Sequence, residues 1–297
     1  MHFACIHTHT LFCDGSDDIE TCCAAAYRKG LACLGFSAHS PIQRKTGFTN
    51  ICNLSDEKLE EYIGEVLAAK KRWEGKLPVY LGLEVDFIEG LTGPADRDFR
   101  ELNLDFMIGS VHYLIPGKGK PFSVDDKAEA VDRGIKESYG GDPLGMVEAY
   151  FNAEAAMIRA GGFDLLGHPD LVRKNNSPPG SRVNRLFSEE TDYYREKIHA
   201  IAALMGKTEI PSELNTGGLN RGKTKDCYPS LPFLKLFRKY GVPMVINADA
   251  HRAEDLDGHY DKAREIMLSA GYNETLIFMG RANGKAIWET ERLTVEL

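Results

Sequence analysis

Short apolar runs alternate with amphipathic stretches along most of the chain, and this alternation limits the folds open to it. The apolar runs predict strands at 3–7, 32–38, 79–84, 105–111, 163–167, 208–214, 244–248 and 275–279. Amphipathic periodicity predicts helices at 17–30, 55–73, 94–102, 143–159, 188–205, 230–240 and 259–270. Strands that alternate with helices favour a parallel sheet, and about seven such units favour its closure into a barrel.

No linker rich in proline, glycine and serine divides the chain, so residues 1–297 are predicted to form a single α/β domain. Two stretches interrupt the regular alternation. Residues 115–142 are rich in glycine, lysine and aspartate and predict a loop or lid with some helix. Residues 173–187 predict a second, irregular loop.

The charge balance of the chain argues against some classes of partner. The formal net charge is -8, so the whole molecule offers no basic footprint for nucleic acid or for an acidic membrane. No apolar run approaches the roughly 18 residues of a membrane span, and no basic segment followed by an apolar one opens the chain. A cytoplasmic protein is therefore expected.

Histidine and carboxylate side chains stand where most of the predicted strands end. His7 and His9 are two residues apart, so both imidazoles point to the same side of a strand. In β/α barrels the carboxyl ends of the strands converge on one site. The candidates at these ends, with Asp14 in the first turn, are His7, His9, Asp14, His39, Glu84, His112, His168, Asp249 and His251. Any one alone would be an ordinary polar residue, but together they predict a shared site.

The chemistry of these donors points to metal ions. Imidazoles and carboxylates without thiolates favour Zn, Mn or Fe, and the sequence leaves the choice among the three open. Nine donors exceed the needs of one ion, so they suit two or three divalent ions that share a bridging carboxylate. Clustered divalent ions lower the pKa of a bridging water and neutralise phosphate charge, so no serine or cysteine nucleophile is required.

The order of these motifs resembles that of a known family. The motifs are His7-Thr8-His9-Thr10, Asp14-Gly15, His39, Glu84, Ser110-Val111-His112, Gly167-His168-Pro169 and Asp249-Ala250-His251. They resemble the PHP (polymerase and histidinol phosphatase) family over the whole span from His7 to His251. Within the family, the segments 109–112, 213–216 and 228–230 resemble the histidinol-phosphate phosphatase branch.

The resemblance implies a distorted (β/α)7 TIM-like barrel with a centre of three metal ions. By position, the ligands would be His7, His9, Glu84 and Asp249 for the first ion, Glu84, His112 and His168 for the second, and Asp14, His39 and His251 for the third. The implied reaction is hydrolysis of L-histidinol phosphate to L-histidinol and phosphate by a metal-bridging hydroxide, in histidine biosynthesis. The catalytic residues implied are His7, His9, Glu84, Asp249 and His251.

Three further residues are candidates for binding the substrate. Arg173 and Arg221 follow strand ends and could grip phosphate oxygens through paired N–H donors. The alternative for each is an ordinary solvated loop arginine. Glu213 could pair with the cationic amine of histidinol, or it could instead orient a metal-binding histidine.

Alternative functions remain open from the sequence alone. A general PHP phosphoesterase would act on nucleotides or other small phosphomonoesters. A nuclease or proofreading role is disfavoured by the acidic charge and by the lack of an additional nucleic-acid domain. A non-catalytic metal-binding protein is disfavoured by the complete set of ligands. The expected partner is a small phosphate ester, and the sequence does not predict an oligomeric state.

Overall fold

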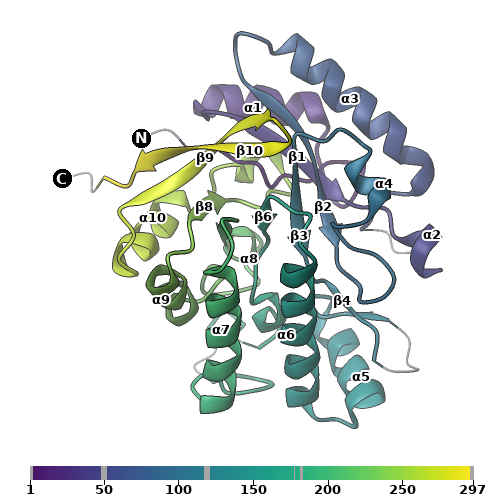
Figure 1. Ribbon diagram of the computed structural model, residues 1–297, viewed down its shortest axis with the longest axis vertical. Helices are drawn as coiled ribbons and strands as arrows, with labels where there is room; N and C mark the ends of the chain where they lie inside the picture. The colour runs from purple at the N-terminus through teal and green to yellow at the C-terminus, as the bar shows by residue number, and fades with distance from the viewer. Residues whose placement is uncertain (1–2, 48–51, 117–120, 177, 181–182, 295–297) are drawn as a thin grey trace.

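Six of the predicted strands form one parallel sheet, as a computed structural model of the chain shows (Figure 1). The structure describes all residues except 1–2, 48–51, 117–120, 177, 181–182 and 295–297. The strand order is β1-β2-β3-β6-β7-β8, so every neighbour in the sheet follows the previous one along the chain. The strands are β1 Leu34–His39, β2 Val79–Asp86, β3 Phe106–Ser110, β6 Leu165–Leu166, β7 Ser212–Asn215 and β8 Met244–Asn247.

The first apolar run does not form a regular strand, which corrects the prediction for residues 3–7. It makes isolated parallel bridges to both edges of the sheet, from Cys5 to Leu34, the first residue of β1, and from Thr8 to Ala250 just beyond β8. Because the segment changes partner within these few residues, no continuous ladder can form along either edge. It nevertheless joins the two edges, and the sheet curls into the predicted distorted barrel.

The longer helices lie around the outside of the curled sheet (Figure 1). They are α1 Ile19–Lys29, α3 Leu59–Arg72, α5 Ala128–Tyr139, α6 Pro143–Ala160, α7 Asp192–Met205, α9 Leu231–Tyr240 and α10 Tyr260–Ser269. Shorter helical turns are α2 Gln43–Thr46, η1 Asp56–Lys58, α4 Arg97–Arg100, η2 Leu171–Arg173, α8 Gly217–Asn220 and η3 Ala253–Asp255. Helix α7 begins later than predicted, because the Thr191 side chain rather than Ser188 accepts from the helix backbone. Within the described part of the chain, no helix combines the length and apolar character needed to cross a bilayer.

Helix α3 buries a narrower stripe than its sequence pattern indicates. Tyr62, Val66 and Ala69 are fully buried, at the four- and three-residue spacings of one helix face. Leu67, an apolar residue of the same helix, is 48% exposed. It follows Val66 by one residue and therefore points about 100° away from the buried face.

The two long excursions differ in structure. The stretch 115–142 was predicted as a loop or lid with some helix, and α5 is that helix. A short hairpin of β4 Tyr113–Leu114 and β5 Phe122–Ser123, which was not predicted, leads into it, and 117–120 lie outside the described residues. Of the loop predicted at 173–187, Arg173 ends the η2 turn, and the described residues of 174–187 are irregular as predicted.

The last predicted strand lies outside the barrel sheet. It is β9 Glu274–Ala282, which pairs antiparallel with β10 Lys285–Arg292. Asn283 and Gly284 both have positive φ in the two-residue turn, as this tight hairpin requires. The hairpin crosses one end of the sheet (Figure 1), where the ring of Phe278 lies 5.4 Å from that of Phe106 at the start of β3. The amino-terminal end of the barrel is thus covered, and the carboxyl end remains available for a site.

The Phe106 ring fills the barrel interior at the amino-terminal end. It leaves no room for a side chain at Gly82 on the neighbouring strand. A Cβ on Gly82 would lie 2.4 Å from Phe106 Cζ, well inside contact distance. We expect Gly82→Ala to lower the free energy of unfolding by about 1–3 kcal/mol, measured by urea denaturation. Gly64→Ala is the control, because Gly64 is exposed on α3 and its added Cβ meets nothing within 4 Å. Equal stability of Gly82→Ala and the unmodified protein would contradict this packing.

Candidate metal centre

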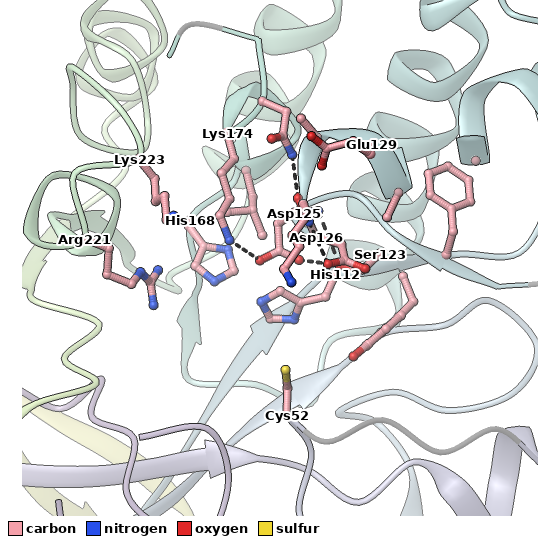
Figure 2. A pocket seen from close by; sticks show the side chains of 18 of the residues that line it. Cys52, His112, Ser123, Asp125, Asp126, Glu129, His168, Lys174, Arg221 and Lys223 are labelled. Carbon is pink, nitrogen blue, oxygen red and sulfur yellow. Dashed lines mark hydrogen bonds and ion pairs between the residues drawn. The ribbon is translucent and has the colours of Figure 1, made fainter. Parts of the chain in front are cut away.

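The predicted ligands come together at the carboxyl end of the sheet. His39 is the last residue of β1, and His112 and His168 follow β3 and β6 by two residues each. A cavity of about 1750 Å³ opens here. The predicted ligands that line it are Asp14, His39, Glu84, His112, His168, Asp249 and His251. His7 and His9 are buried in contact with this group. Figure 2 shows His112 and His168 side by side in the cavity.

Glu84 occupies the middle of the cluster. Its Oε2 lies 3.3 Å from His7 Nε2 and 3.5 Å from His9 Nε2. Its Oε1 lies 2.9 Å from His168 Nε2 and 3.5 Å from His112 Nε2. The two oxygens of one carboxylate therefore face two different pairs of imidazoles, which is the geometry of a bridging ligand.

Asp249 completes the group around the first histidine pair. Its Oδ1 lies 3.3 Å from His9 Nε2 and 3.8 Å from His7 Nε2. Asp249 lies in the loop just beyond β8. Its φ is positive (47°), which is uncommon for a residue other than glycine. His7, His9 and Asp249 each offer a ligand atom within 4.8 Å of the others, close enough to share an ion.

Asp14 forms the outer part of the cluster. Its Oδ2 lies 3.2 Å from His251 Nε2, and its Oδ1 lies 3.7 Å from His39 Nε2 and 3.6 Å from His9 Nδ1. Asp14 is partly exposed at the cavity mouth, whereas His9 is buried. These four residues form the largest of the groups able to hold a metal ion among the described residues.

Several donor atoms in this cluster are buried without a hydrogen-bond partner among the described residues. They include His7 Nε2, His9 Nε2, Asp14 Oδ1 and both carboxylate oxygens of Glu84. Leaving a buried polar atom unpaired is costly, so such atoms are rare. Here the atoms face one another at the distances given above, and a cation between them would satisfy them together. The donor set of imidazoles and carboxylates fits Zn, Mn or Fe.

The electrostatics of the cluster also favour bound cations. Burial opposes charge on Glu84, but nearby imidazoles, above all His7, outweigh it and hold the pKa of Glu84 well below its usual range. Burial likewise opposes charge on His7, but Glu213 and Glu84 raise its pKa well above normal. Burial and the neighbouring His251 lower the pKa of His9 to about 3, so His9 is the neutral imidazole that metals bind. Positive charge beside the buried carboxylates is therefore favourable, and bound divalent ions would supply it.

Glu213 lies behind the histidines rather than in the cavity, which argues against its predicted contact with a substrate amine. It is fully buried, and its carboxylate lies 2.9 Å from His7 Nδ1. The same carboxylate accepts from the His168 backbone N–H at 2.9 Å and from the side-chain amides of Asn215 and Asn247. These contacts match the alternative role of orienting metal-binding histidines.

Asp86 is a functional candidate that the sequence reasoning missed. Its Oδ1 lies 2.7 Å from His112 Nδ1, and its Oδ2 accepts from Asn53 Nδ2 at 2.7 Å. Tyr113 donates in turn to Asn53 Oδ1 at 2.9 Å. A signal was available, because Asp86 follows Glu84 by two residues on the same strand and therefore shares its face.

The two arginines predicted to bind phosphate lie in different places. Arg173 is buried and outside the cavity, where its Nε donates to Glu189 at 2.7 Å and its Nη1 donates to Asp170 at 3.3 Å. This placement argues against the predicted phosphate contact of Arg173, because the η2 turn directs this side chain into the protein. The next residue, Lys174, lines the cavity instead.

Arg221 lies where the sequence placed it, in the cavity wall beside the cluster. Its Nη2 is 3.1 Å from Asp249 Oδ2, and its Nη1 is 2.7 Å from His251 Nδ1. Its buried Nε has no hydrogen-bond partner among the described residues. Figure 2 shows Arg221 and Lys174 on the same side of the cavity as His168.

Comparison with known proteins identifies the family. A profile of the PHP domain matches residues 6–217, well over half of the chain. The chain belongs to the PHP family. A Deinococcus radiodurans protein named probable histidinol-phosphatase is 29% identical over 272 residues, which cover 91% of this chain and 94% of that protein. The family predicted from the motifs is thus confirmed.

Solved structures support the same fold. The crystal structure of a Listeria monocytogenes protein named as the putative histidinol phosphatase HisK matches with a TM-score of 0.76 at 26% identity, over 87% of this chain and 99% of that one. Histidinol phosphate phosphatase (HisK) from Lactococcus lactis matches with a TM-score of 0.65 at 20% identity, over 96% of this chain and 98% of that one. The predicted fold class is confirmed.

Proposed function

We propose that this PHP protein is a metal-dependent phosphomonoesterase that hydrolyses L-histidinol phosphate to L-histidinol and phosphate. The observation that carries the proposal is the bridged cluster around Glu84 in a cavity that also presents Arg221 and Lys174. The Deinococcus relative, similar over nearly its whole length, bears the name of this activity. The Lactococcus HisK structure was solved as a complex with zinc, L-histidinol and phosphate.

We propose that the site holds two or three divalent ions of Zn, Mn or Fe, and we assign their ligands from the distances within the cluster. The proposed sets are His7, His9, Glu84 and Asp249, then Glu84, His112 and His168, and finally Asp14, His39 and His251. When bound, clustered divalent ions acidify water and neutralise the charge of a phosphate. The chain itself contributes by holding imidazoles and ionised carboxylates in place, with Glu213 and Asp86 fixing the orientation of His7 and His112.

Arg221 and Lys174 would bind the non-bridging phosphate oxygens. Both line the cavity, and Arg221 retains an unpartnered buried N–H among the described residues. Guanidinium and ammonium donors make charge-assisted hydrogen bonds to phosphate, and they disperse the charge that develops during hydrolysis.

We expect Arg221→Ala to lower kcat/KM about 10-fold and to weaken inhibition by inorganic phosphate by a similar factor, because one charged hydrogen bond is lost. Steady-state phosphate release and product inhibition measure both effects. Metal content is measured in parallel because Arg221 also contacts Asp249. Arg252→Ala is the control, since Arg252 is exposed and pairs with Glu254 and Asp255. Unchanged phosphate inhibition in Arg221→Ala would exclude this role.

The test of the function compares substrates on protein reconstituted with Mn or Zn. We expect kcat/KM for L-histidinol phosphate to exceed that for nucleoside monophosphates by at least about 100-fold, since a site built to recognise one leaving group rejects others. Equal values would favour a general phosphoesterase. No phosphate release from any ester, with metal bound, would favour a non-catalytic metal-binding protein.

We also propose that residues 1–297 form one domain. A single cluster of buried apolar residues includes Cys5 near the start, Tyr150 in α6 and Leu293 near the end. One shared core of this kind is characteristic of a single domain.

A further inference from the structure

The cavity wall away from the metal ligands carries charges of both signs. It is built by the segment around β5 and α5 and by the loop after η2. Its acidic residues include Asp125, Asp126 and Glu129. Asp126 and Glu129 are exposed, whereas the Asp125 side chain is 23% exposed and lies deeper in the wall. Charges interact more strongly where water is partly excluded, so Asp125 has the largest influence on a bound ligand.

Asp125 is held in place beside a cation. Its Oδ2 accepts from Lys174 Nζ at 2.8 Å, and its Oδ1 accepts from the Ser123 hydroxyl. An ionised carboxylate has about four lone-pair positions, so these two donors leave capacity for a third. Figure 2 shows Asp125 joined to Lys174 and close to His112. The carboxylate is therefore fixed near the catalytic cluster with room to accept another donor.

Further contacts hold the two segments of this wall together. Asn175 Nδ2 donates to the backbone oxygen of Asp126 at 2.9 Å. Arg185 Nη1 pairs with Asp132 of α5 at 2.7 Å. Together with the Lys174 contact, they link the loop after η2 to the β5–α5 segment at three points along the cavity. Such preorganisation reduces the entropic cost of using Asp125 in binding.

A carboxylate at this position would weaken the binding of a ligand that carries only a phosphate charge. The proposed function takes Lys174, which lines the cavity, as a phosphate ligand, and Asp125 Oδ2 lies 2.8 Å from the Lys174 ammonium. The negative charge of Asp125 would repel a nearby phosphate dianion. A ligand that also carries a positive charge close to its phosphate turns this repulsion into attraction. In L-histidinol phosphate, two carbons separate the amine nitrogen from the ester oxygen, so its ammonium stays close to the phosphate.

We propose that Asp125 is a specificity-determining residue that binds the ammonium group of a substrate whose amine lies two carbons from the phosphate ester. By the same charge, Asp125 disfavours phosphate esters that lack an amine. This inference rests on the proposed function, since it takes Lys174 as a phosphate ligand. It gives the amine a partner inside the cavity, in place of the buried Glu213.

The experiment measures kcat/KM for two esters, L-histidinol phosphate and its analogue without the amine, 3-(imidazol-4-yl)propyl phosphate. The unmodified protein is expected to prefer the amine-bearing ester at least about 10-fold, the value of one charged hydrogen bond. Asp125→Asn is expected to abolish most of this preference. Any loss through Lys174 or through folding lowers both values alike, so it cancels in the ratio.

Two control variants keep their preference if the inference is right. Asp126→Asn changes the adjacent exposed carboxylate of the same wall, and Asp132→Asn removes the partner of Arg185. An unchanged preference in Asp125→Asn would overturn the inference, and so would equal use of both esters by the unmodified protein. Failure of the proposed function is distinct, because it appears as slow hydrolysis of both imidazole esters relative to nucleoside monophosphates.

Discussion

Glu84→Gln is expected to lower kcat/KM for phosphate ester hydrolysis at least about 10³-fold, the largest effect of any single substitution considered. The carboxylate faces His7 and His9 through one oxygen and His112 and His168 through the other. An amide has the same shape but no negative charge, and it presents an N–H group where a metal ligand is required. The variant should therefore bind fewer divalent ions per chain.

Phosphate release, elemental analysis of bound metal and thermal unfolding followed by circular dichroism test this expectation together. Glu154→Gln is a matched control, because Glu154 is also a fully buried carboxyl but lies outside the cavity lining. Burial raises the pKa of Glu154 well above its usual range, which favours the uncharged carboxylic acid that an amide resembles. Full metal content and activity in Glu84→Gln would rule out a bridging role for Glu84.

Glu213→Gln is expected to lower kcat about 100-fold while leaving KM for L-histidinol phosphate nearly unchanged, since loss of a partner that orients metal ligands has this size of effect. Glu213 accepts hydrogen bonds at His7 Nδ1 and at the His168 backbone N–H. A glutamine at this position would place its NH2 group, a donor, against groups that themselves donate hydrogen bonds, such as the His168 backbone N–H. The free energy of unfolding should also fall by about 1–3 kcal/mol.

Kinetics and urea denaturation of Glu213→Gln separate its two candidate roles. If Glu213 bound the substrate amine, KM would rise and kcat would change little. Glu209→Gln is the control, because Glu209 lies just before β7 and is exposed. A raised KM with unchanged kcat would restore the amine-binding interpretation and would weaken the case for Asp125.

Most of the candidate metal centre could be predicted because its residues follow a rule of local structure. Each of His39, His112 and His168 stands at or just beyond the end of a parallel strand. Such ends meet at one edge of a barrel whatever the details of packing. Asp86 could have been predicted by the same rule, since it shares a strand face with Glu84.

The residues whose predicted substrate contacts the structure does not support lie in irregular segments or depend on distant partners. Arg173 and Lys174 are neighbours in a short turn, where a change of one residue exchanges the buried and the cavity-facing side chain. Glu213 stands at a strand end like the metal ligands, but His7 and Asn247 from other segments surround it. No pattern within the local sequence distinguishes such a residue from one that faces the cavity.

The sequence by itself determined the α/β barrel, the PHP family and the set of ionisable side chains at the carboxyl ends of its strands. It did so because strand and helix periodicity is a local property of the chain, and the order of the motifs can be followed directly along the sequence. Only the tertiary structure decided that the β9–β10 hairpin covers one barrel end, that Glu84 faces two pairs of imidazoles, and that Asp125 lies beside Lys174. These features are contacts between segments far apart in the sequence, and their geometry depends on how the whole chain packs.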